Sequence, residues 1–272
     1  MKVALVTAGR AGIGRAIVDL LLTNGYYVAV TGRSLAALEE DFDWGTQVSP
    51  TSPCAGSLSG KHLSQLLFIK TDVTNLNDCN NAVEMTIAQF GQLDLLVNNA
   101  GGATLYQTFE TGTSGAFDEA FNLNVRSVFF MSQFAIPFLI ETRGCIINVS
   151  SVLGQRPAVG LGPYCASKAA VEMLTKTAAL ELAPKQVRVL CIAPTATQTE
   201  FHVNAGMTDE EADEYYKACA SIHPLGRVGK ATDMAELVLF LADSRKSGFM
   251  TGAIIPVDGG RLLTSASAFK NT

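Results

Sequence analysis

The chain has 272 residues, 48% of them apolar and only 17% charged, which supplies a large core and excludes a disordered chain. Lys and Arg number 20 against 25 Asp and Glu, so the net charge is −5, and there is no basic run that would track a phosphate backbone. We therefore expect no nucleic-acid partner. The six scattered cysteines form no Cys-x-x-Cys pair, which favours buried thiols in a reducing compartment over a disulfide framework and predicts no metal site.

The sequence predicts neither a secretion signal nor a membrane span. The apolar run at 2–7 is too short for the core of a signal peptide, and glycines and arginines follow it at once. The longest apolar stretch, 128–140, contains Ser132, Gln133 and Pro137 and is shorter than the roughly 20 residues that cross a bilayer. We expect a buried helix there, and a cytoplasmic protein with no membrane partner.

Strand-like and helix-like segments alternate from the start of the chain. Residues 2–7 are an apolar run, 12–24 have helical spacing of apolar residues, and 27–31 are apolar again, so a strand, a glycine turn, a helix and a strand follow one another. Near-continuous apolar strands indicate a parallel sheet covered on both faces. We predict an α/β fold, a doubly wound sheet of seven parallel strands with about six helices, in a single domain over 1–272. The remaining strands are expected at 66–70, 93–98, 145–150, 187–193 and 253–257.

Two segments interrupt this alternation. Residues 43–64 are rich in Ser, Pro and Gly and are expected to form a surface loop. Residues 195–224 break the alternation late in the chain, and the part at 199–224 is a candidate flap over a substrate site.

The turn after the first strand contains Gly9, Gly12 and Gly14, where missing side chains let the backbone approach a pyrophosphate at a helix N-terminus. A tight turn that only packs the helix on the strand is the alternative. The second strand ends at Arg33, where NAD-preferring sites carry an acid. A guanidinium there, with Arg10 in the glycine turn, favours NADP(H) over NAD(H), although Arg33 could also be an exposed arginine at a helix start.

Tyr164 and Lys168 are four residues apart in a segment, 164–183, whose composition suggests a helix, so both project from one face. A neighbouring ammonium stabilises a phenolate, so we expect Lys168 to lower the pKa of Tyr164 from its ordinary value near ~10. Ser151 follows the strand at 145–150, at the sheet edge where such folds bind ligands, and could hydrogen-bond a substrate oxygen. A surface tyrosine with a solvated lysine is the alternative for this pair.

These motifs occur in a characteristic order, and the chain resembles the short-chain dehydrogenase/reductase family over residues 2–260. The resemblance implies that Tyr164 is the general acid in reduction, Ser151 polarises the carbonyl, Lys168 also holds the nicotinamide ribose, and Asn124 anchors a water in a proton relay. The implied cofactor-binding residues are Thr7, Gly9, Arg10, Gly12, Ile13, Gly14, Arg33, Asp72, Val73, Asn98, Ala100, Gly101, Tyr164, Lys168, Pro194, Thr197 and Thr199.

Several of these residues have a structural alternative. Asp72 and Asn98 have short polar side chains that also cap turns, and Thr197 and Thr199 lie in a Thr-rich turn. The chain departs from the family pattern at two further positions. Ala8 stands where the first glycine of the turn is usual, and Thr195 replaces the glycine that usually follows Pro194, which leaves the shape of the pocket open.

The resulting functional prediction is an NADPH-dependent oxidoreductase that interconverts a ketone, or a 3-oxoacyl group, and a secondary alcohol. The alternatives on the same scaffold are a non-catalytic nucleotide sensor, and a lyase or dehalogenase. A sensor is expected to lack one of the three reactive side chains, and all three are present.

Aromatic residues in the candidate flap and in one long helix predict partners. Phe201, Tyr215 and Tyr216 in the flap favour a hydrophobic carbonyl substrate, although the tyrosines could simply pack the flap to the body. The helix expected at 116–140 has more apolar circumference than one sheet covers, which predicts a homo-oligomer, a tetramer or a dimer. Burial under the chain's own loops is the alternative.

Overall fold

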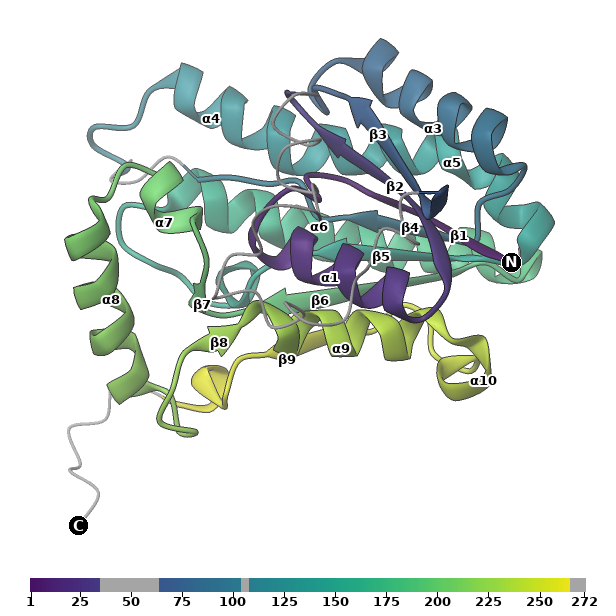
Figure 1. Cartoon of the computed structure of the whole chain (residues 1–272). Helices are drawn as coiled ribbons and strands as arrows, with labels where there is room; N and C mark the ends of the chain where they lie inside the picture. Colours follow the sequence, from purple (N-terminus) through teal and green to yellow (C-terminus); the bar gives the residue numbers. More distant parts are fainter. Residues whose placement is uncertain (35–63, 104–107, 265–272) are drawn as a thin grey trace.

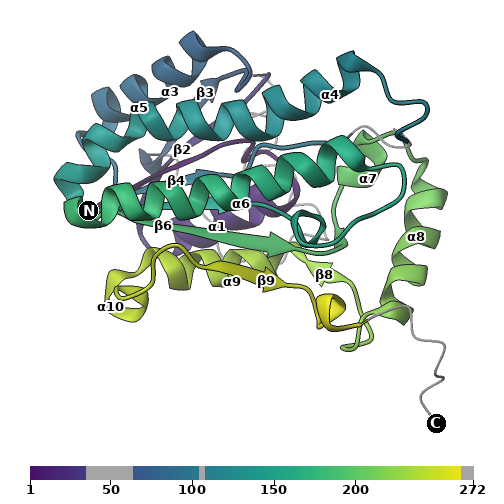
Figure 2. The ribbon, with the colours of Figure 1, turned by 180° about the vertical axis from the view of Figure 1, so that it is seen from behind.

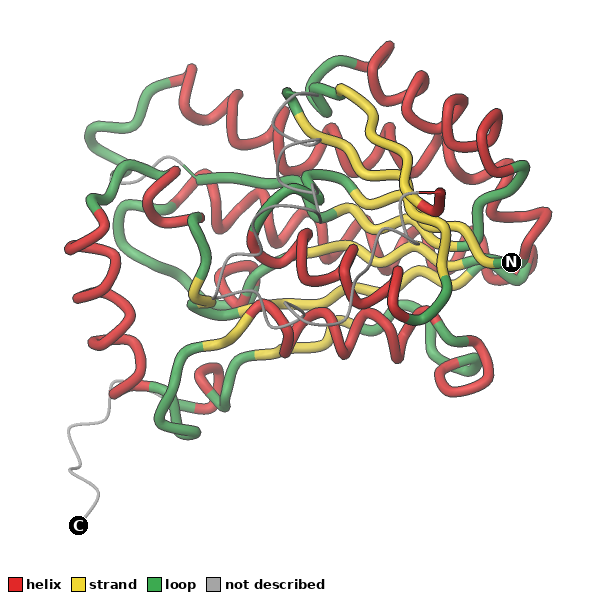
Figure 3. Tube along the Cα trace, viewed as in Figure 1, coloured by secondary structure: helices red, strands yellow, loops and turns green. Residues whose placement is uncertain are grey.

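The computed structural model describes residues 1–34, 64–103 and 108–264. Seven strands form one sheet in the order β3-β2-β1-β4-β5-β6-β9, and every neighbouring pair is parallel. The seven-stranded parallel sheet predicted from the sequence is confirmed (Figure 3). Its strands are β1 (Lys2–Val6), β2 (Tyr26–Gly32), β3 (Leu66–Lys70), β4 (Leu95–Asn98), β5 (Cys145–Val149), β6 (Arg188–Pro194) and β9 (Ile254–Val257).

Helices cover both faces of the sheet, as a doubly wound fold requires (Figures 1 and 2). On one face α1 (Gly12–Thr23) packs against α9 (Ala231–Ala242), with α10 (Ser244–Ser247) beside α9. On the other face lie α3 (Leu76–Phe90), α5 (Ser127–Thr142) and α6 (Gly162–Leu182). Two buried clusters of apolar side chains, one under each helical layer, make the core.

The carboxyl ends of all seven strands share one edge, where Figure 1 shows α7 (Phe201–Asn204) and α8 (Asp209–Ile222). The chain leaves β1 toward β2 on one side and returns to β4 on the other. This reversal opens a crevice beside the end of β1, which is the usual ligand site of such sheets.

The helix expected at 116–140 is a longer run with an irregular middle. It consists of α4 (Ser114–Phe121), a π-helical turn at Asn122–Arg126, and α5. The run is long and apolar enough to cross a membrane by length and composition. One face of α5 packs against α3 and β4, but only a third of the apolar stretch is buried, so the helix expected to be buried is only partly so. A π-helical turn inside an α-helix frequently marks a functional site.

Of the two interruptions, only the later one is described. It contains two short paired strands, β7 (Thr197–Gln198) and β8 (Gly229–Lys230), besides α7 and α8. The candidate flap at 199–224 is therefore largely helical. The loop expected at 43–64 lies outside the described residues, except for its last position.

Candidate active site

The turn between β1 and α1 leaves a helix N-terminus open to a ligand. Ala11, the N-cap residue of α1, makes no side-chain hydrogen bond, and no acid lies in the first turn. By contrast, Asn75 caps α3 and Thr208 caps α8 with their side chains. Unsatisfied N–H groups at the positive end of the helix dipole, next to Gly12 at φ +55°, fit an anionic pyrophosphate.

The two other glycines of this turn serve close packing. A Cβ on Gly9 would lie 2.7 Å from Cγ1 of Val30 in β2, and one on Gly14 would lie 2.4 Å from a main-chain oxygen of the turn. Only glycine permits both approaches. Ile13, between them, packs half-buried on the core under α1.

Ala8 adopts the backbone conformation that its position demands of a glycine. Its φ is +51°, in the left-handed region, where a Cβ costs roughly 1–2 kcal/mol. The turn therefore keeps the conformation that a glycine would adopt, although Ala8 stands there. The substitution strains the backbone locally and does not rearrange the loop.

A brace of hydrogen bonds ties the glycine turn to the end of β4. Oγ1 of buried Thr7 accepts from the N–H groups of Asn99 and Ala100, both at 2.9 Å, and donates to O of Val97 at 3.3 Å. The Asn99 amide in turn donates to O of Thr7 at 3.0 Å and O of Ala8 at 3.1 Å. Asn99 is not among the site residues predicted from the sequence, although an amide directly after a strand is a usual signal of such bracing.

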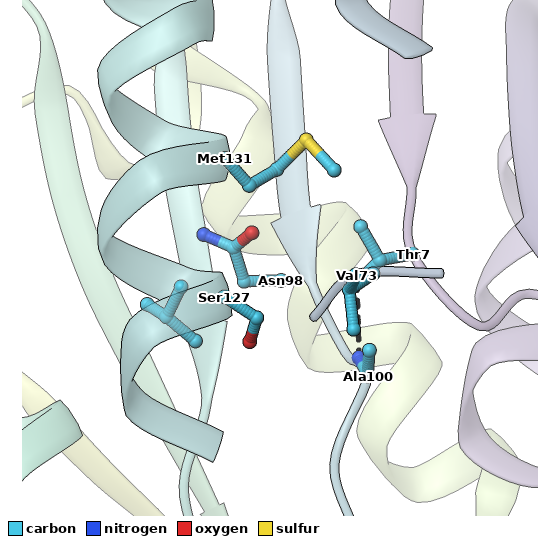
Figure 4. A pocket seen from close by; sticks show the side chains of 7 residues that line it. Thr7, Val73, Asn98, Ala100, Ser127 and Met131 are labelled. Atoms are coloured by element: carbon cyan, nitrogen blue, oxygen red, sulfur yellow. Dashed lines mark hydrogen bonds between the residues drawn. The ribbon is translucent and has the colours of Figure 1, made fainter. Parts of the chain in front are cut away.

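Asn98 is held inside the protein. Its amide donates to Oγ of Ser132 at 3.0 Å and to Oδ1 of Asn148 at 2.8 Å, so its side chain joins β4 to β5 and α5. A narrow cavity opens beside it between α5 and the ends of β1 and β4 (Figure 4). Its lining residues are Thr7, Val73, Asn98, Ala100, Ser127, Val128 and Met131.

Arg33 and Arg10 are both exposed, on the turns after β2 and β1. Asp72 lies close to Arg33: the pKa of its carboxyl is lowered by hydrogen bonds from Thr74, and the Arg33 charge adds to the shift. Oδ1 of Asp72 accepts from N of Thr74 at 2.9 Å and from its Oγ1 at 2.7 Å. The capping alternative for Asp72 is therefore realised in this structure.

Tyr164 and Lys168 lie buried on the same face of α6. The ammonium nitrogen of Lys168 lies 5.7 Å from the centroid of the Tyr164 ring and donates to O of Val149, at the end of β5, at 2.9 Å. The Ser151 side chain lies near enough to Tyr164 to oppose the rise in the pKa of its phenol. The three side chains predicted from the sequence thus converge at one point of the sheet edge.

Burial dominates the electrostatics of this group. It raises the pKa of Tyr164 to about 12, and the hydrogen bond to Ser151 opposes that rise. Burial also lowers the pKa of Lys168 to about 8. The expectation that Lys168 brings the pKa of Tyr164 below its ordinary value is wrong for this structure, because the loss of hydration raises the pKa of the phenol more than the hydrogen bond to Ser151 lowers it.

Asn124 stands in the π-helical turn and is completely buried. Its amide exchanges two hydrogen bonds of 2.9 Å with the backbone of Gly102 and donates to Oγ of Ser167 in α6 at 3.0 Å. A Cβ on Gly101 would lie 2.9 Å from Oδ1 of Asn124 and 3.0 Å from Nζ of Lys168. The chain after β4 therefore passes close against both polar groups, which only glycine allows.

The flap lies against the glycine turn and near the ring of Tyr164. The hydroxyl of Tyr216 in α8 donates to O of Thr199 at 2.8 Å and accepts from N of Thr199 at 3.3 Å, an interaction the sequence did not reveal. Thr199 faces the glycine turn, because a Cβ on Gly12 would lie 3.2 Å from it. The ring of Phe201 in α7 lies 6.2 Å from that of Tyr164. The flap therefore contacts the glycine turn through Thr199 and approaches Tyr164 through Phe201.

The segment after β6 supplies two more threonines. Pro194 ends β6, and buried Thr197 in β7 donates from Oγ1 to O of Thr195 at 2.9 Å. The hydroxyl of Thr195 lies 2.8 Å from Nε2 of His223 at the end of α8. The extra hydroxyl at the usual glycine position thus anchors the base of the flap.

The sequence is similar to known reductases over nearly its whole length. A family model described as enoyl-(acyl carrier protein) reductase matches residues 7–261. L-xylulose reductase from Mesocricetus auratus is 36% identical over 263 residues, 96% of each chain. The chain belongs to the short-chain dehydrogenase/reductase family. The 3-oxoacyl-[acyl-carrier-protein] reductase of Thermotoga maritima is 34% identical over 269 residues, 96% of this chain and 98% of that protein.

Solved members of the family share the fold. A short-chain dehydrogenase/reductase of unknown function from Caenorhabditis elegans, solved with cofactor, matches with a TM-score of 0.87 and 30% identity over 97% of this chain and 96% of its own. The 3-ketoacyl-(acyl-carrier-protein) reductase of Brucella melitensis, solved with NADH, matches with a TM-score of 0.80 and 30% identity over 96% of this chain and 98% of its own. ElxO with NADP bound matches with a TM-score of 0.81 and 28% identity over 97% of this chain and 99% of its own. The chain is therefore an enzyme of this family, an oxidoreductase that uses a nicotinamide cofactor on the CH–OH or C=O group of a small molecule.

Replacing Ala8 by glycine is expected to stabilise the protein. The change Ala8→Gly removes the left-handed strain and should raise the free energy of unfolding by about 1 kcal/mol, seen in denaturant titration at unchanged slope. The control change Ala88→Gly, at an exposed position inside α3, should lower the free energy of unfolding by about 0.5–1 kcal/mol. A loss of stability in both variants would contradict the strained turn.

Proposed function

We propose that this enzyme is an NADPH-dependent reductase that interconverts a ketone, or a 3-oxoacyl group, and a secondary alcohol. The observation that carries the proposal is the meeting of buried Tyr164 with Ser151 and Lys168 beside an uncapped helix N-terminus. A non-catalytic sensor would have no use for an acid, a hydrogen-bond donor and a buried cation at one point.

In the proposed reaction Tyr164 is the proton donor. With a pKa of about 12 the phenol is protonated at neutral pH, and it can donate to a carbonyl oxygen that hydrogen-bonds to its hydroxyl. Ser151 donates a second hydrogen bond to the same oxygen and stabilises the charge that develops there. Lys168, whose ammonium lies 5.7 Å from the centroid of the Tyr164 ring, is placed to bind the nicotinamide ribose beside the reacting group. A dihydronicotinamide bound in the site would supply the hydride.

The residues present fit a dinucleotide. The N-terminus of α1 would hold the pyrophosphate, because its N–H groups have no side-chain cap and lie at the positive end of the helix dipole. Among the described residues the buried ammonium of Lys168 has a single hydrogen-bond acceptor, O of Val149, which leaves N–H groups for the hydroxyls of a ribose. Arg33, which replaces the usual acid, supports a 2′-phosphate and hence NADP(H).

The side chains around Tyr164 support an apolar substrate. Phe201 faces its ring, and Tyr215 is close enough for the charge of Tyr164 to affect its pKa. His202 packs on Tyr215, and burial lowers the pKa of His202, so it is neutral at physiological pH. These contacts favour a hydrophobic ketone over an anionic substrate.

We also propose that the protein is a homo-oligomer. The long helix and α6 expose apolar side chains on the outer layer: Phe117 and Phe129 are about half exposed, and Met173 and Leu180 more so. Such a concentration marks a protein contact surface.

The five cysteines in the described part of the chain are free thiols, which supports a cytoplasmic location.

The change Tyr164→Phe tests the reaction. It should lower kcat for ketone reduction by about 10²-fold or more and leave the Kd of NADPH within about twofold, because only the proton donor is lost. Turnover is followed by nicotinamide absorbance over a panel of ketones and 3-oxoacyl thioesters. The control Tyr27→Phe, on β2 against Phe90, should retain full activity. Unchanged turnover in Tyr164→Phe would mean that the proton comes from elsewhere.

Cofactor preference is tested at Arg33. The change Arg33→Ala should weaken NADPH binding about tenfold or more, because a charge-assisted hydrogen bond is lost, and should hardly affect NADH. Fluorescence titration with each nucleotide measures both Kd values, and exposed Lys185→Ala serves as the control. An equal loss for NADH and NADPH, or stronger binding of NADH by the unmodified enzyme, would refute the preference.

A further inference from the structure

The face of α6 that carries Tyr164 and Lys168 carries a third buried polar group one turn further on, Glu172. The proposed chemistry gives this carboxylate no role, and its hydrogen bonds go to Ser150 and Gln155 and not to Tyr164. A buried ionisable group is costly to bury unless it is hydrogen-bonded. Its partners therefore indicate what it does.

One oxygen of Glu172 joins the two ends of the loop that carries Ser151. Oε1 accepts from Oγ of Ser150 at 3.2 Å, directly before Ser151, and from Nε2 of Gln155 at 3.1 Å, four residues after it. The Ser150 hydroxyl also lies 3.1 Å from O of Lys168, so its proton is shared between two acceptors on α6. The loop is thus fastened to the helix on both sides of Ser151.

Gly154 shows how closely the loop lies on the helix. A Cβ there would lie 2.9 Å from Oε1 of Glu172, 3.0 Å from C of Lys168 and 3.1 Å from N of Ala169. No other residue type would let the short 3-10 turn Val152–Gly154 rest on this carboxylate. The turn begins at Ser151, whose Oγ accepts from N of Leu153 at 3.2 Å.

We propose that Glu172 is a positioning residue for Ser151, one that fixes the distance between the Ser151 hydroxyl and Tyr164. The inference rests on the proposed function of Ser151 as the donor to the carbonyl oxygen. The Ser151 hydroxyl is needed by Tyr164 and substrate, so the loop must be held by other groups. Hydrogen bonds to a carboxylate are among the stronger ones available. Three successive turns of α6 then provide the proton donor Tyr164, the cation Lys168, and Glu172, which holds the loop of Ser151 in place.

The test compares Glu172→Ala with Glu172→Gln and with Glu181→Ala, an exposed glutamate on the same helix. Glu172→Ala should lower kcat by about 10- to 10²-fold, since a small displacement of a catalytic group has effects of this order. The Kd of NADPH should remain unchanged. Glu172→Gln keeps an acceptor oxygen and should restore most of kcat, and Glu181→Ala should behave as the parent enzyme.

A double-mutant cycle separates positioning from general stability. In a Ser151→Ala background, Glu172→Ala should cause no further loss of kcat, because the group it positions is already gone. Equal losses in both backgrounds, or no loss in the parent, would overturn the proposal. If Glu172→Ala does not fold, the double change Ser150→Ala with Gln155→Ala removes both donors and is expected to lower kcat about tenfold. Unchanged kcat there would also overturn it. Full activity of Ser151→Ala itself would instead contradict the proposed function.

Discussion

The burial of Tyr164 and Lys168 on one face of α6 is the constraint on which the rest of the site depends. Removing both groups from water keeps the phenol protonated, with a pKa of about 12, and depresses the pKa of Lys168 to about 8. In that environment each hydrogen bond and each charge has a larger effect than it would have in water. The surrounding structure supplies the partners that make this burial tolerable: O of Val149 for the ammonium and Ser151 for the phenol.

The fold brings these partners together because all strands end at one edge. Val149 and Ser151 follow from β5, and the glycine turn follows from β1. Asn99 and Thr7 lock the glycine turn to the end of β4, while Asn124 holds the chain after β4 against α6. The site is therefore assembled from main-chain ends that the sheet aligns, and few of its parts depend on a flexible loop.

Much of this was predictable from the sequence. The positions of the strands along the chain follow from apolar runs. The four-residue spacing of Tyr164 and Lys168 places both side chains on one face of a helix, whatever the tertiary structure. The glycine turn is also local, and the sequence alone identifies Ala8 as a departure at a position whose φ is +51°. These features depend on neighbours in the chain.

What could not be predicted depends on groups distant in the chain. The sign of the pKa shift of Tyr164 is set by burial among α6, the end of β5 and the flap, which spacing does not reveal. The direction of the Thr195 hydroxyl depends on His223, and the bracing by Tyr216 depends on how α8 packs. The π-helical turn that presents Asn124 has no simple sequence signal.

The most direct test is an ultraviolet titration of phenolate absorbance in the cofactor-free enzyme, with Tyr164→Phe subtracted from the parent. The account predicts that the Tyr164 component does not ionise below about pH 11, so that the group is a proton donor throughout the neutral range. A Tyr164 component that ionises below pH ~10 would show that the neighbouring charge outweighs burial, and would contradict the account.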